Sequence, residues 1–200
     1  MFRSWRKRQS EKREQRRRAN HETTREVRRR VAEVVGETVE SLIELGAARL
    51  EPPDGNSVLD SEGPLLQLVP TRDDATSVEI AAGSDWITLV LGRGYDHEML
   101  VHPTYEWEWE LRLCIEAVVE GRYREIFTPG EPDAPSSSVG GSVSRGFDPK
   151  LEIDPGRRSL TMLFEHRDGS GMAMTHYGSL DGVEDRLPDG ERRYASYVQC

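Results

Sequence analysis

Long apolar runs are absent from this 200-residue sequence, and their absence excludes several classes of protein. No stretch approaches the roughly 20 apolar residues that a membrane-spanning helix needs. The basic start of the chain continues into a polar segment instead of the apolar core of a secretory signal peptide. Because only 36% of the residues are hydrophobic, the core must be modest, which favours one domain with a polar extension. We expect a soluble, cytoplasmic protein without a membrane span.

Cysteine is also scarce, and catalytic signatures are missing. Cys114 and Cys200 cannot build a disulfide framework, and neither has a cysteine or histidine at the spacing of a zinc site. Cys114 lies on the apolar stripe of a predicted helix, where burial makes a thiol inert. The glycines around residue 93 lack the pattern of a nucleotide-binding loop. We predict no catalytic residue, no metal and no cofactor, and therefore a protein that is not an enzyme.

Histidines offer the remaining route to acid–base or metal chemistry. His97 and Glu98 are neighbours on a predicted strand, so they point to opposite faces and cannot serve one site. His166 and His176 flank a predicted hairpin turn and could meet across its strands, but two imidazoles alone make a poor zinc site. We interpret His97 as a partly exposed residue without a chemical role.

Charge is distributed unevenly along the chain. Residues 1–30 contain 13 Lys+Arg and 4 Glu, a net charge of +9, which leaves 14 basic and 32 acidic residues, a net charge of -18, for the rest. Residues 1–26 form a basic arm with too few apolar side chains to pack as a domain. Such an arm can bind nucleic-acid phosphates, bind an anionic membrane surface or remain a solvated tail. The candidate contacts for an anionic partner are Arg13, Arg16, Arg17, Arg18, Arg28, Arg29 and Arg30.

Valines and leucines at three- and four-residue steps predict an amphipathic helix over residues 27–50. Thr23 and Glu26 fit a capping box at its start, although the arginine-rich residues before them could extend the helix toward the N-terminus. Gly46 or the following pair of prolines would end it.

Residues 57–200 are predicted to form an acidic domain of short strands. The runs 76–82 and 86–91 would pair through a tight Gly83–Ser84 loop with glycine at positive φ, within a simple meander. Residues 131–150 are rich in Pro, Ser and Gly, which predicts a flexible exposed loop. The predicted fold class is α+β: a mostly antiparallel sheet of short hairpin strands with one packed helix, preceded by the long amphipathic helix and the basic arm.

The packed helix follows Pro103, ends at Gly121 and opens with the run YEWEWE. Since residues two apart on a helix are about 200° apart, Trp107 would face the core and Trp109 the solvent. Glu106, Trp109 and Glu110 would then share one exposed patch. Acids at a helix N-terminus can be purely stabilising, whereas aromatics in a charged rim are typical of protein-binding hot spots. The candidate partner-binding residues are Tyr105, Glu106, Trp109 and Glu110.

The order of elements over residues 76–180 resembles the small α+β immunity proteins that neutralise bacterial toxins. The segments that carry the resemblance are TSVEIAAGSDWITLVLGRGYDHEML, AVVEGRYREIF and SLTMLFEHRDGSGMAMTHYGSL. The resemblance implies a non-catalytic inhibitor that occupies a toxin's active site, and an acidic body would suit a basic nuclease toxin. The arginine-rich arm and the long first helix depart from such single compact domains. We therefore predict an immunity-like, non-enzymatic binding protein whose acidic body engages a protein partner. The alternative is a nucleic-acid-associated accessory protein that acts through the basic arm.

Overall fold

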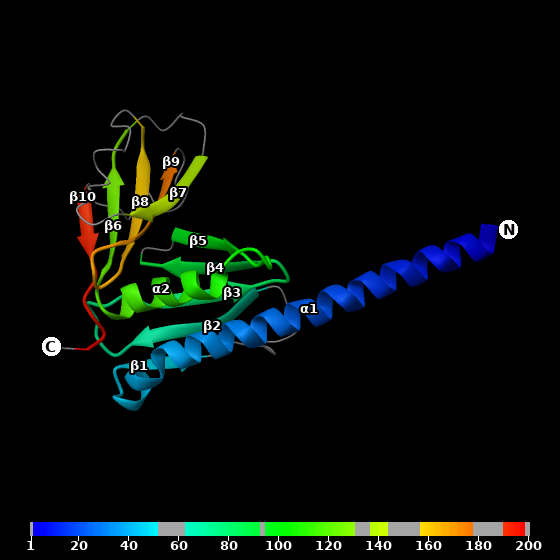
Figure 1. Cartoon of the computed structure of the whole chain (residues 1–200), viewed down its shortest axis with the longest axis horizontal. Helices are drawn as coiled ribbons and strands as arrows, with labels where there is room; N and C mark the ends of the chain where they lie inside the picture. The colour runs from blue at the N-terminus through cyan, green and yellow to red at the C-terminus, as the bar shows by residue number, and fades with distance from the viewer. Residues whose placement is uncertain are drawn as a thin grey trace.

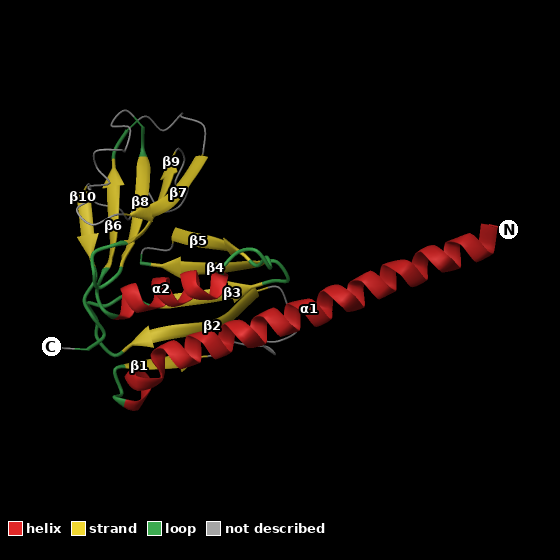
Figure 2. Cartoon of the chain, in the orientation of Figure 1, coloured by secondary structure: helices red, strands yellow, loops and turns green. Residues whose placement is uncertain are grey.

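The computed structural model shows an α+β fold with two helices and two antiparallel sheets among the described residues, which confirms the predicted fold class (Figures 1 and 2). The strands form two sheets where the sequence suggested one. The structure describes residues 2–51, 63–92, 95–130, 137–143, 157–177 and 190–198. Of residues 2–22 it describes the backbone only.

The first sheet is a meander, as expected, in which neighbours in sequence are neighbours in space. Its strands are β1 (Ala48–Glu51), β2 (Gly63–Pro70), β3 (Val78–Ala82), β4 (Trp86–Leu91) and β5 (Tyr95–Leu100). The loop between β3 and β4 has three residues, not two, and Gly83 does not adopt a positive φ. Glycine is needed there because a Cβ would collide with the indole of Trp86.

The second sheet has the strand order β10-β6-β8-β9-β7. Its strands are β6 (Tyr123–Thr128), β7 (Ser137–Val143), β8 (Ser159–Glu165), β9 (Gly171–Tyr177) and β10 (Gly190–Arg193). The prediction of a flexible loop over residues 131–150 is wrong for 137–143, because these residues form strand β7 and pair with β9 along its whole length. As an edge strand it needs one row of hydrogen bonds, so its serines and glycines are tolerated. The remainder of that loop, 131–136 and 144–150, lies outside the described residues.

Helix α1 (Phe2–Glu44) begins far earlier than the predicted capping box, which is wrong as a start because Thr23 lies inside the helix. The preceding residues are mostly Arg, Lys, Glu and Gln, which favour helix, and no glycine or proline interrupts them. The helix ends at Glu44. Gly46 caps it with φ +68°, and the N–H groups of Gly46 and Ala47 donate to the carbonyls of Ile43 and Leu42. In Figure 1 its N-terminal half projects beyond the body.

The C-terminal half of α1 docks on the first sheet beside helix α2 (Trp107–Val119), and both helices lie on the same face of that sheet (Figure 2). The docked side of α1 consists of valines at three- and four-residue steps, which share one core with α2 and the sheet. The fully buried valines are Val31, Val34, Val35 and Val39. Helix α2 ends at Val119, and Gly121, the glycine predicted to cap it, follows with φ +70°.

Candidate functional site

The start of α2 carries the exposed aromatic residues of the predicted partner-binding patch. Trp109 is 52% exposed, and Tyr105 and Glu106 are also exposed. Trp107 is half-buried and packs against the core, so the assignment of the two tryptophans to inner and outer sides is confirmed. The Trp109 ring lies 5.8 Å from that of His166, which follows β8. We call Tyr105, Glu106 and Trp109 the aromatic surface.

Glu110 does not belong to this surface, and its predicted exposure is wrong. Only 4% of Glu110 is exposed. It lies three residues after Trp107 and four before Cys114, so it shares their inward side of the helix. One carboxylate oxygen is hydrogen-bonded to Nε2 of His97 at 2.8 Å, and the other accepts the hydroxyl of Tyr105. Glu110 therefore supports Tyr105 from inside instead of meeting a partner directly.

His97 is also buried, contrary to its interpretation as a partly exposed residue. It is 1% exposed, its ring lies 5.6 Å from that of Phe164, and its Nδ1 has no hydrogen-bond partner. Glu98 is exposed, which confirms that the two neighbours point to opposite faces. The proposed meeting of His166 and His176 is wrong, because His176 lies opposite Leu160 and His166 follows the end of the strand.

The surroundings of the His97–Glu110 pair favour a structural role over catalysis. Cys114, one helical turn after Glu110, is fully buried. Burial, and then the charge of Glu110, raises the pKa of the Cys114 thiol well above its usual value, so it stays protonated near neutral pH. Within the described residues, no group of three or more His, Cys, Asp or Glu side chains is placed to hold a metal ion.

A second buried carboxylate, that of Glu125, joins the C-terminal segment to the core. It accepts hydrogen bonds from the hydroxyls of Tyr123 at 2.8 Å and Tyr194 at 2.7 Å, and the two phenol rings stack. Burial, and then Glu125, raises the pKa of Tyr123 well above its usual value, so Tyr123 remains a donor. Tyr197 donates to the carbonyl of Thr76 at 2.5 Å. Tyr194 and Tyr197 are both buried, so the C-terminal segment is docked on the core.

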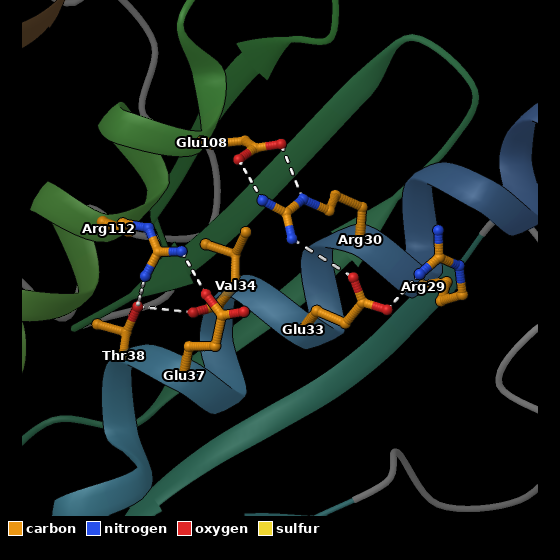
Figure 3. A network of polar contacts seen from close by, with 8 residues as sticks. All are labelled: Arg29, Arg30, Glu33, Val34, Glu37, Thr38, Glu108 and Arg112. Atoms are coloured by element: carbon orange, nitrogen blue, oxygen red, sulfur yellow. Dashed lines mark hydrogen bonds and ion pairs between the residues drawn. The ribbon is translucent and has the colours of Figure 1, made fainter.

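A polar network holds α1 against α2 (Figure 3). Nε and a terminal nitrogen of Arg30 donate to the two carboxylate oxygens of Glu108 at 2.9 and 2.7 Å. One turn further along, Arg112 donates to Glu37 at 2.5 Å. The hydrogen bonds from Arg30 lower the pKa of Glu108, so this carboxylate remains ionised in mild acid. The network fixes the direction in which α1 leaves the body.

Three of the arginines predicted to bind an anionic partner, Arg28, Arg29 and Arg30, instead make contacts within the chain. Arg28 is buried, and it donates to the carbonyl of Ala82 at 2.9 Å, so its predicted place on a binding surface is wrong. Arg29 pairs with Glu33, and Arg30 with Glu108. All three arginines were predicted to contact an anionic partner, but a helix distributes neighbours around its axis and turns one of them inward. The side chains of Arg13, Arg16, Arg17 and Arg18 lie outside the described residues.

Comparison of the chain with models of known families, with curated proteins and with solved structures gives no match. The resemblance to immunity proteins therefore stays a prediction. In the part of the chain that the structure describes, neither helix has the length and apolar character that a membrane crossing requires.

Proposed function

We propose that the protein is a non-enzymatic binding protein whose acidic body engages a basic protein partner through the aromatic surface. The observation that carries this proposal is the exposure of Trp109 at 52% on an otherwise well-packed helix. A tryptophan offers a large contact area that loses little conformational freedom on binding. Leaving it in water is unfavourable, and a partner that covers it gains that area.

Rigid supports hold the aromatic surface in place. The opposite side of α2 is buried from Leu111 to Val119, and Glu108, between Glu106 and Trp109, is fixed by Arg30. Tyr105 is restrained by its hydrogen bond to Glu110. A surface that is ordered before binding loses less entropy when a partner arrives. Its acidic surroundings would speed the approach of a basic partner, because residues 31–200 carry a net charge of -18.

Truncation of Trp109 should separate binding from stability. We expect Trp109→Ala to weaken the partner complex by about 2 kcal/mol or more, roughly 30-fold in Kd, because central aromatics dominate such interfaces. The partner is recovered with the wild-type chain, identified and purified, and then titrated against both chains by calorimetry. Urea unfolding should show little change in stability.

Leu45→Ala is the matched control, since Leu45 is an exposed apolar residue at the far end of α1. It should leave both affinity and stability unchanged. Equal affinity of the Trp109→Ala and wild-type chains for the partner would contradict the proposal.

The projecting half of α1 favours a second function, nucleic-acid binding. Residues 2–22 contain nine Lys+Arg and three Glu, a net charge of +6, on a continuous helix that leaves the body. At 1.5 Å per residue this part is about 30 Å long, several times the Debye length of about 8 Å in physiological salt. The acidic body therefore does not cancel the charge at the far end. An α-helix also fits the major groove of DNA.

Duplex binding should depend on the arm. We expect Arg16→Gln with Arg17→Gln to flatten the slope of log K against log salt by about 2, because each lost phosphate contact removes about 0.9. Fluorescence anisotropy with a labelled DNA duplex measures this slope. Arg49→Gln with Arg193→Gln removes two exposed charges from the body and should leave the slope unchanged. An arm variant with the wild-type slope would exclude the arm as the binding element.

A further inference from the structure

The first sheet has a second face on which none of the described helices packs. Side chains alternate along β4: Ile87, Leu89 and Leu91 are buried beneath the helices. Trp86 and Val90, with Thr88 between them, are half-buried and point to the opposite face. Figures 1 and 2 show α1 and α2 together on the other side of this sheet.

Acidic residues flank these three side chains. Val90 lies between Glu79 on β3 and Asp96 on β5, and Thr88 lies opposite Glu98 on β5. None of the three carboxylates forms an ion pair with another described side chain, although Asp96 interacts electrostatically with His176 of the second sheet. Strands β2 to β5 contain no lysine or arginine. We call this surface the outer strip; it consists of Trp86, Thr88 and Val90 with Glu79, Asp96 and Glu98.

The chain itself contains a segment of complementary charge. Residues 2–22 carry a net charge of +6 and include two aromatic residues, Phe2 and Trp5. This segment cannot reach the outer strip of its own molecule. The same helix is docked from Val27 to Val39 on the opposite face of the sheet, and from there it runs away from the body (Figure 1).

We propose that the outer strip binds the basic half of α1, residues 2–22, of a second copy of this chain. A helix laid on one face of a sheet is a general packing arrangement in α+β proteins. The basic half is about 30 Å long, whereas a strand of six residues spans about 20 Å, so it can cross the whole strip. Each copy offers one basic helix and one strip, so two copies can exchange helices and close into a dimer.

The mass of the full chain in solution tests this contact. Sedimentation velocity should show a species larger than a monomer at low salt that dissociates as salt is added, because the contact is largely electrostatic. The strip variant Glu79→Gln, Asp96→Asn, Glu98→Gln should need at least tenfold more protein to associate. The control Glu40→Gln, Glu44→Gln, Asp73→Asn removes three exposed carboxylates elsewhere and should associate like the wild type.

Complementation between two full-length variants identifies the two halves of the contact. The helix variant Arg13→Gln, Arg16→Gln, Arg17→Gln keeps its strip, and the strip variant keeps its helix. Each alone should be monomeric at a concentration where the wild type associates, and an equimolar mixture, which keeps one of the two contacts, should associate more strongly than either variant alone. A monomeric wild type at low salt would overturn the proposal, as would a strip variant that associates normally. The strip variant should still bind DNA, because its basic helix is unchanged. DNA binding and self-association through the same helix are thereby distinguished.

Discussion

Glu110→Ala should lower the free energy of unfolding by about 1–3 kcal/mol, the usual cost of leaving a buried hydrogen-bonding group without its partner. The substitution leaves Nε2 of His97 without its acceptor in a place where water does not reach, and Nδ1 of the same ring already lacks a partner. Tyr105 loses less, because it is exposed and its hydroxyl can bond to water. Urea unfolding, followed by circular dichroism, measures the change.

Neighbouring variants separate this effect from a general loss of acidity in α2. Glu106→Ala removes an exposed carboxylate four residues earlier and should change stability by no more than about 0.5 kcal/mol. The double variant His97→Leu, Glu110→Leu replaces both partners by apolar groups and should recover much of the loss. A Glu110→Ala chain as stable as the wild type would show that the buried pair does not join α2 to β5.

Gly121→Ala should also be strongly destabilising, by about 2–5 kcal/mol. The left-handed backbone at this position, φ +70°, costs an alanine about 1–2 kcal/mol. In addition, its Cβ would lie 2.6 Å from the backbone nitrogen of Ser196, in the C-terminal segment that Tyr194 and Tyr197 anchor. Backbone cannot rotate away as a side chain can, and overpacking of this kind adds about 1–3 kcal/mol.

Gly46 provides a matched control for this prediction. It ends α1 with nearly the same geometry, φ +68°, but a Cβ there meets nothing within 4 Å. Gly46→Ala should therefore show the backbone cost alone, about 1–2 kcal/mol. Thermal unfolding of both variants gives the comparison. Equal losses of stability in the two variants would mean that the C-terminal segment moves away from the added Cβ at no cost in free energy.

The central strands could be predicted from the sequence because their side chains report burial. Strand β4, with its alternating buried residues, begins and ends where its pattern indicated, from Trp86 to Leu91. Strand β10 could not be found in this way, since all four of its residues are exposed and only backbone pairing with β6 defines it. Edge strands such as β7 need few core side chains, so composition alone resembles that of a loop.

The candidate site was predicted in part. The contrast between Trp107 and Trp109 followed from helical geometry, and the structure agrees. The burial of Glu110 was predictable from its spacing to Trp107 and Cys114, but its charge argued for exposure. Its acceptor role depends on His97, which comes from another element, and a pairing between separate elements leaves no pattern in a single sequence.

The continuous α1 helix also behaves as a lever. The part of α1 that packs on the body, from Val27 to Val39, is about 20 Å long. The 25 residues before it extend for about 37 Å. A force on residues 2–22 would therefore exert torque on the contacts of Arg30 with Glu108 and of Arg112 with Glu37. Both contacts end on α2, the helix that carries Trp109. A displacement of the projecting half of α1 would therefore act on the helix that presents the aromatic surface.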